Sequence, residues 1–451
     1  MSTTPSGISS TLRPRPRSFP YPYLGAAAAG VTGLVVERFG STAVRQRYQT
    51  ARLRALLRHA HKTVPFYTRR FAQAGFHPDQ FRTLDDLQRV PITRKDDIRL
   101  APDEDAVASD YDPALLRRFV TGGSTGEPTR LRFSPFEVRL LMLFRLFINM
   151  RYGQRLRDRR TQLRSDAPLS KIDDKFFFPS QLMYAFQPQE QMRASLCQFQ
   201  PQVIRGFPSA LSSVADHITD EDRLRLRPRF LTTDSENLTE LAREQIERGF
   251  RAPVYDFYDT FECNVIAYQC PQGEGYHVLD PSVVVEVLDE EGQPVAPGES
   301  GQIAVTSLHS WVAPLIRYMP GDVVERGPSQ CACGARNATL SKVLGRIHDR
   351  FLLPNGRTLL PKYLATVLRL VMPSLRQYQM VQETRDRVVI KLQTIPGVEL
   401  PAEKLEAVRK GMARHLGDEV TILISIVDEI PCEPNGKFRP YRSYVNQVGV
   451  L

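Results

Sequence analysis

The sequence predicts an α/β protein in which a large N-terminal domain, built of helices, mixed sheets and a β-rich part, precedes a small α+β domain. The chain has 451 residues, more than one ordinary hydrophobic core organises. Hydrophobic residues make up 42% and charged residues 24%, a balance typical of a soluble globular protein. Near residue 345 a turn-rich join begins, and short helices and strands alternate after it. We therefore expect a mobile tail at 1–24, a large domain at 25–345 and a small, mobile domain at 346–451.

Hydrophobic periodicity predicts the elements in order. Residues 43–75 have helical spacing that Pro65 interrupts, and the dense apolar run at 135–152 predicts a buried helix. Residues 238–250 predict an amphipathic helix that leads into a strand. Two β-rich runs around Gly- and Pro-containing turns predict a hairpin over 282–308. In the small domain we expect a helix at 362–371, a strand at 387–393, a helix at 402–415 and a strand at 420–427.

Charge and apolar patterning argue against several classes of protein. No stretch approaches the roughly 20 apolar residues that span a bilayer. The apolar run at 25–36 follows a basic tail but lacks a cleavage site, so we expect a cytoplasmic protein. The net charge is +10, and 151–164 holds six arginines, which form either a solvated basic face or a docking surface for a phosphate-rich partner. No aromatic interleaving accompanies the charge, which argues against nucleic acid.

The stretch "TGGSTGEPT" at 121–129 is the first candidate site. Gly122, Gly123 and Gly126 free the backbone to aim successive N–H groups at one anion, and Ser124 and Thr125 add hydroxyl donors. No Lys-Ser/Thr pair follows the glycines, so the stretch is not a Walker A loop. Taken alone, it suits a hairpin turn as well as a phosphate loop.

Four further motifs follow this stretch: "YDTFECNVIAYQCP" (258–271), "IRYMPGD" (316–322), "LGRIHD" (344–349) and "PNGKFRP" (434–440). In this order and spacing they resemble the adenylate-forming superfamily of acyl-CoA ligases and peptide-synthetase adenylation domains, in particular its phenylacetate–CoA ligase and capsule-biosynthesis branch. The likeness covers about residues 50–445. It implies that ATP activates a carboxylic acid to an acyl-adenylate with release of pyrophosphate, and that the acyl group then passes to an acceptor.

The resemblance also implies roles for single residues. Glu236 would line the adenine pocket, Tyr258 would stack near adenine, and Glu262 would hold Mg²⁺. The residues that match the phosphate-holding loop for ATP are Thr121, Gly122, Gly123, Ser124, Thr125 and Gly126.

Three further matches concern ribose and catalysis. Asp322 would accept both ribose hydroxyls, and Arg346 would lie near ribose and phosphate. Lys437 would bridge the acyl carboxylate and the α-phosphate, where a compact point charge stabilises the charge that develops.

Four positions depart from the family pattern. Thr129 replaces a lysine, Asp259 a glycine, Phe261 a Thr or Ser, and His348 an Asp or Lys. Arg130 or a more distant residue would then supply the positive charge of the phosphate loop. The departures keep open a homologue that binds nucleotide without turnover. A ligase that joins AMP to a cofactor is a third alternative.

Cysteine placement indicates a metal site. Cys270-x6-His277 and Cys331-x-Cys333 supply four ligands of the kind found in structural Zn²⁺ sites, although not at the common finger spacing. Cys263 is an alternative to His277 as the fourth ligand. Buried thiols with an unrelated histidine are the other interpretation.

The resemblance makes coenzyme A the expected acceptor. An amine, a hydroxyl or a carrier protein on a separate chain are alternatives, and association into a homodimer stays open. We expect residues 135–265 to line the acid pocket, where aromatics and arginines suit an aromatic or medium-sized acid.

Overall fold

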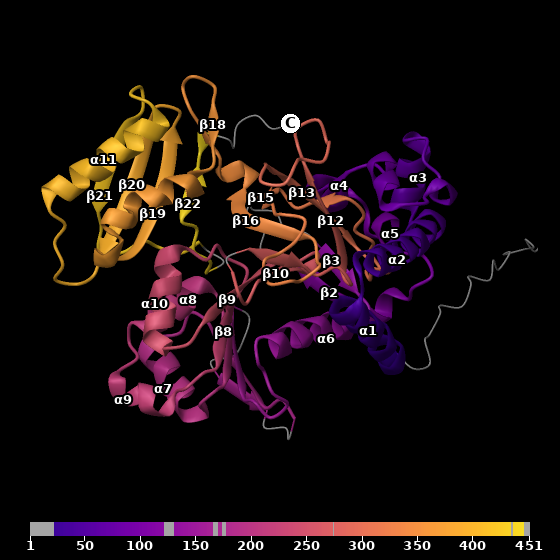
Figure 1. The fold of residues 1–451 in the computed structure, drawn as a ribbon, viewed down its shortest axis with the longest axis horizontal. Coiled ribbons are helices and arrows are strands. Elements are labelled where there is room, and N and C mark those ends of the chain that lie inside the picture. Colours follow the sequence, from indigo (N-terminus) through magenta and orange to yellow (C-terminus); the bar gives the residue numbers. More distant parts are fainter. Residues whose placement is uncertain are drawn as a thin grey trace, which may run out of the picture.

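The computed structural model describes residues 22–120, 130–165, 170–173, 177–273, 275–433 and 436–445. Figure 1 shows a large N-terminal domain, indigo to orange, and a small C-terminal domain, yellow-orange, at one end. The fold class that the sequence predicts, a large α/β domain followed by a small α+β domain, is confirmed. Among the described residues, no helix combines the length and apolar character needed to cross a membrane.

Two N-terminal helices, at Thr42–Thr63 and Pro65–Gln73, pack around one apolar core. Val64 ends one helix and Pro65 begins the next, as the sequence predicts, because proline is accepted in a first helical turn but not in the interior. The helices of this part are α1 (Pro22–Phe39), α2 (Thr42–Thr63), α3 (Pro65–Gln73), α4 (Lys95–Leu100) and α5 (Asp103–Ala106).

The apolar run at 25–36 belongs to α1, which lies against α6 (Pro135–Arg151). A Cβ at Gly30 would lie 2.3 Å from Leu143 Cδ2, so glycine permits this close approach. At the end of α1, buried Glu37 pairs with Arg45 at 3.0 Å. The helix begins inside the expected tail of 1–24, and residues 1–21 lie outside the described residues.

A parallel group of strands carries the middle of the chain. Successive strand residues alternate between two cores: Val203 faces α6, whereas Ile204 faces the opposite helices. The opposite helices are α7 (Gln189–Phe199), α8 (Pro208–Ala215) and α10 (Glu240–Phe250), with α9 (Asp220–Arg225) beyond them. The strands run in the order β9 (Val254–Thr260), β8 (Phe230–Thr233), β7 (Val203–Gly206), β4 (Arg160–Arg164), β6 (Ser180–Tyr184), β5 (Ser170–Asp173), of which β5 is antiparallel.

The same sheet continues from β9 into a mainly antiparallel, β-rich half. The predicted hairpin over 282–308 is confirmed as β12 and β13, which pair antiparallel. The strands of this half are β10 (Asn264–Gln269), β11 (Tyr276–Val278), β12 (Val283–Leu288), β13 (Ser300–Ser307), β14 (Tyr318–Met319), β15 (Asp322–Arg326) and β16 (Thr339–Arg346), with β1 (Thr93–Arg94) at the edge.

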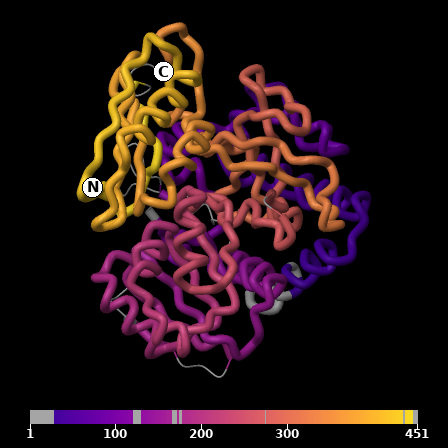
Figure 2. The backbone as a smooth tube through the Cα atoms, turned by 60° about the vertical axis from the view of Figure 1, so that its left-hand side comes forward, coloured from indigo at the N-terminus to yellow at the C-terminus, as the bar shows by residue number. Residues whose placement is uncertain are grey.

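The C-terminal domain is a four-stranded sheet covered by a helix, with its own buried core. It lies over α10, where Gln245 donates to the carbonyl of Arg376 at 2.9 Å (Figures 1 and 2). The expected helix at 362–371 is a 3-10 helix at Pro361–Leu370, and strands β19 and β22 were not expected. Its sheet runs β21 (Thr421–Ile426), β20 (Arg387–Thr394), β19 (Leu375–Thr384), β22 (Tyr441–Ser443), and α11 spans Ala402–Leu416.

Candidate active site

Tyr258, Asp322 and Arg346 meet although they are far apart in the sequence. β15 and β16 pair so that Asp322 lies opposite Arg346, whose Nε is 2.8 Å from Asp322 Oδ1. The Tyr258 hydroxyl donates to Asp322 Oδ2 at 2.8 Å. Asp322 raises the pKa of Arg346, and burial raises the pKa of Tyr258 well above its ordinary value. A carboxylate has about four acceptor positions, so Asp322 can still accept from a diol.

Glu262 lies beside a lysine that the sequence analysis missed. The Tyr318 hydroxyl donates to Glu262 Oε1 at 3.3 Å, and Lys95 Nζ at the start of α4 is 4.0 Å from the same oxygen. Glu262 also lines a cavity of about 370 Å³ together with Arg130 and Arg132. This cavity therefore has a carboxylate and cationic side chains in its wall.

The glycine-rich stretch joins two paired strands. β2 (Arg117–Val120) and β3 (Arg130–Phe133) are antiparallel, with Val120 opposite Arg130. Residues 121–129, hence all six candidate phosphate-loop residues and Thr129, lie outside the described residues. Arg132 is paired with Asp103, whereas Arg130 is exposed directly after the stretch and Lys95 lies beside Glu262.

Lys437 lies in a segment of the small domain, residues 436–439, that docks onto the large domain. Glu236 Oε1 accepts the N–H of Phe438 at 2.9 Å, and burial raises the pKa of Glu236 to about 7. Lys437 Nζ lies 5.9 Å from the ring centroid of Phe207. Gly436 has a φ of +79°, and a Cβ there would lie 2.3 Å from Phe186, so both conformation and close approach require glycine. Glu236 therefore contacts this segment of the small domain. The resemblance implied only that Glu236 lines the adenine pocket.

After Arg346, at the join between the two domains, Ile347–Asp349 form a short 3-10 turn. Asp349 is buried and pairs with Arg439, two residues after Lys437. His348 is exposed in this turn. Two other departures lie among the described residues: Asp259 pairs with Arg145 at 2.7 Å, and Phe261 is 52% exposed.

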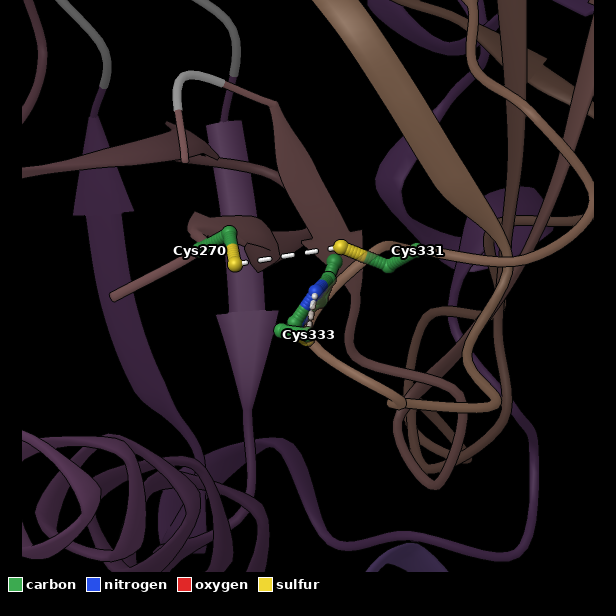
Figure 3. A group of neighbouring side chains, drawn as sticks. Cys270, Cys331 and Cys333 are labelled. Atoms are coloured by element: carbon green, nitrogen blue, oxygen red, sulfur yellow. Dashed lines mark hydrogen bonds between the residues drawn. The ribbon is translucent and has the colours of Figure 1, made fainter. Parts of the chain in front are cut away.

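Cys270, His277, Cys331 and Cys333 place their ligand atoms within 4.8 Å of one another. Figure 3 shows the cysteine side chains converging from the end of β10 and from the connection between β15 and β16. The two cysteine sulfurs of Cys270 and Cys331 are 3.8 Å apart, and Cys333 Sγ is 3.4 Å from His277 Nε2. Tetrahedral Zn²⁺ would separate two sulfurs by about 3.8 Å and sulfur from nitrogen by about 3.6 Å. The four residues therefore fit such an ion.

The alternative fourth ligand, Cys263, does not belong to this group. It is buried in the apolar core with Tyr258 and Ile266, and burial raises its pKa. His277 occupies the fourth position because β11 pairs with β10 and brings His277 opposite Tyr268, two residues before Cys270.

Known proteins share this architecture. The family model described as CapK C-terminal domain matches residues 351–443. The chain is 24% identical to the phenylacetate-coenzyme A ligase of Thermus thermophilus, over 87% of this chain and 94% of the relative. It is 24% identical to protein CapK of Staphylococcus aureus, over 79% of this chain and 80% of the relative.

Solved structures of one ligase superpose on the chain in two states. 2-Hydroxyisobutyryl-CoA ligase in the postadenylation state, in complex with R3-HIB-AMP, has a TM-score of 0.76 at 20% identity, with 91% of each chain covered. The same ligase in complex with 2-HIB-AMP and CoA in the thioesterification state has a TM-score of 0.63 at 21% identity, again with 91% of each chain covered.

The sequence matches, at 24% identity over most of the chain, define the class: the chain is a homologue of the adenylate-forming ligase superfamily, and the solved structures share its fold. Within that superfamily it is a distant homologue in the phenylacetate–CoA ligase and CapK branch. The resemblance on which the sequence analysis relied is thereby confirmed.

Proposed function

We propose that the chain is an AMP-forming ligase that converts a carboxylic acid and ATP into an acyl-adenylate and pyrophosphate, and then transfers the acyl group to coenzyme A. The convergence of Tyr258 and Arg346 on the carboxylate of Asp322 is the observation on which this proposal depends. These are the residues that the family resemblance assigns to adenine, ribose and phosphate. The names of the relatives, which are coenzyme A ligases and CapK, support the acid–thiol class.

In this proposal the polar side chains bind the nucleotide and stabilise its charge. Asp322 accepts hydrogen bonds from the ribose hydroxyls, and Arg346, on the paired strand, faces the phosphates. Lys437 stabilises the charge that develops as the acid carboxylate attacks the α-phosphorus in line. Glu262 would hold Mg²⁺, which neutralises phosphate charge when bound. The six residues of the 121–126 stretch would hold the β- and γ-phosphates.

We also propose that residues 346–451 rotate against 25–345 about the 346–349 turn after adenylate formation. The segment that contains Lys437 contacts the large domain through Glu236, which accepts the N–H of Phe438, and through the rings of Phe186 and Phe207. The higher TM-score for the postadenylation state of the related ligase than for its thioesterification state supports an arrangement that precedes thioester formation.

Acid-dependent exchange of labelled pyrophosphate into ATP tests the first half-reaction. We expect exchange with at least one acid of a panel of aromatic and medium-sized carboxylates. We expect a coenzyme A thioester when coenzyme A is added. Exchange without thioester would favour an amine, hydroxyl or carrier-protein acceptor, and retained labelled AMP would indicate nucleotidyl transfer. ATP binding with no exchange for any acid would identify a homologue that has lost turnover.

We propose that Lys95 supplies the positive charge near the ATP phosphates that the family's usual lysine provides and that Thr129 cannot provide. Lys95→Ala should raise the KM for ATP in the exchange reaction about 10- to 100-fold, the size expected for loss of one charged contact. Lys95→Arg should keep most of the affinity. The double variant Lys95→Ala/Thr129→Lys restores a cation at the family's usual position and should recover at least part of the loss. An unchanged KM in Lys95→Ala would exclude this role.

A further inference from the structure

Two arginines and two aspartates form a compact group, the four-charge cluster, in the large domain. Arg145 on α6 reaches Asp234 at 2.9 Å and Asp259 at 2.7 Å. Arg205 pairs with Asp234 and lies 4.0 Å from Asp259. The exposed side-chain fractions are 13% for Arg145, 6% for Asp234, 10% for Asp259 and 27% for Arg205. The cluster is therefore nearly buried and meets solvent chiefly through Arg205.

The cluster stands at the carboxyl ends of neighbouring parallel strands. Arg205 is on β7, Asp234 follows β8 and Asp259 is the penultimate residue of β9. These three strands are paired in that order. In open α/β sheets, ligands bind in the crevice outside the carboxyl ends of the strands. The position in the sheet thus indicates a ligand rather than a purely structural ion-pair group.

Three of the four members are close in sequence to a residue of the candidate active site or of its surroundings. Asp259 follows Tyr258, which binds Asp322. Asp234 lies two residues before Glu236, which accepts a hydrogen bond from the segment that contains Lys437. Arg205 precedes by two residues Phe207, whose ring lies 5.9 Å from Lys437 Nζ. These sequence neighbours link the cluster to the segment where Lys437 is proposed to hold the reacting carboxylate, so the rest of the acid can extend toward the cluster.

The charges of the cluster are balanced. Despite burial, Arg205 and Arg145 hold the pKa of Asp234 below its ordinary value, whereas burial and Asp234 raise the pKa of Asp259. An ionic substrate group would add an uncompensated charge to two cations and two anions in a nearly dry site, which is costly. An apolar group would displace water from charged atoms without replacing its hydrogen bonds. A hydroxyl or carboxamide can accept from a guanidinium and donate to a carboxylate.

We propose that the four-charge cluster binds a neutral polar group of the acid substrate, a hydroxyl or a carboxamide, and so makes the chain select polar acids over apolar acids of the same size. The inference rests on the proposed function and names its substrate class. The aromatic or medium-sized acid expected from the sequence would then carry a polar substituent.

Pyrophosphate exchange with matched acids tests the inference. The pairs are butyrate with 3-hydroxybutyrate and 4-hydroxybutyrate, and phenylacetate with 4-hydroxyphenylacetate; succinate and β-alanine add an anionic and a cationic group. We expect kcat/KM to favour a hydroxylated member about 10- to 100-fold over its parent and over both charged acids. Preference for a parent acid or for a charged acid would overturn the inference alone. Exchange with no acid would contradict the proposed function and the inference with it.

A double variant separates selection from stability. Arg145→Met/Asp259→Gly removes one cation and one anion together and should reduce the preference for the hydroxylated acid to below about 3-fold, mainly through its KM. Because both acids are measured on one preparation, the ratio is independent of the folded fraction. The control Arg193→Met/Asp222→Asn removes a pair of 2.8 Å between α7 and α9 and should keep the wild-type ratio. An unchanged ratio in Arg145→Met/Asp259→Gly would show that the cluster has only a structural role.

Discussion

Lys437→Ala should lower acid-dependent pyrophosphate exchange on the order of 10³-fold, because it removes the cation proposed to stabilise the transition state of adenylate formation. The thioester-forming step from a chemically supplied acyl-adenylate should stay within a few-fold of wild type, since the domain rotation would withdraw Lys437 before that step. The two half-reactions are measured separately, the first by exchange and the second by thioester formation from adenylate and coenzyme A.

The docked position of Lys437 makes this split specific. Lys410→Ala, on the exposed face of α11, removes a lysine of the same domain and should change neither half-reaction. Gly436→Ala should instead weaken docking, because a Cβ there meets Phe186. Equal losses of both half-reactions in Lys437→Ala would contradict the proposed division of roles.

Removal of the candidate metal should have the second large effect. We expect about one Zn²⁺ per chain in the purified protein, and nearly none in Cys331→Ser/Cys333→Ser. The ion would tie the connection between β15 and β16 to the β10–β11 hairpin, so we expect the variant to have a Tm lower by about 5 °C or more. Elemental analysis and thermal unfolding measure the two quantities.

Cys197→Ser is the matched control for the metal. Cys197 is on α7, where its thiol donates to Asp222 at 3.3 Å, and a serine hydroxyl can make the same contact. This variant should keep its metal and its Tm. Chelator-washed protein that contains no metal and unfolds at the original temperature would refute a structural role for the ion.

The sequence predicted the class of protein well because its strongest signals are local. The order of five motifs indicated the superfamily. Hydrophobic periodicity and proline predicted the helix break at Pro65, the helix α6 and the β12–β13 hairpin. The expected helix at 362–371 is a 3-10 helix, and the sequence did not predict strands β19 and β22. β22 is three residues long and is formed by pairing with β19, which local periodicity does not reveal.

The candidate site divides in the same way. Motifs in the sequence indicated Tyr258, Asp322, Arg346 and Lys437. No motif indicated Lys95, which contacts Glu262 from a helix 167 residues earlier in the chain. Asp259 read as a departure from a family pattern. The role of Asp259 depends on its ion pair with Arg145. Arg145 lies on a helix that the sequence predicts to be buried, and no local sequence pattern predicts that the two residues meet.

The sequence by itself determined that this chain is an adenylate-forming ligase homologue with a candidate Cys₃His site, because both conclusions depend on residue types at short spacing. Only the tertiary structure decided that His277 rather than Cys263 completes the cysteine group, that Glu236 contacts the segment containing Lys437, and that Asp259 is paired by Arg145. These are contacts between distant segments, and their free energy depends on burial and on charges brought within a few ångströms by the sheet order.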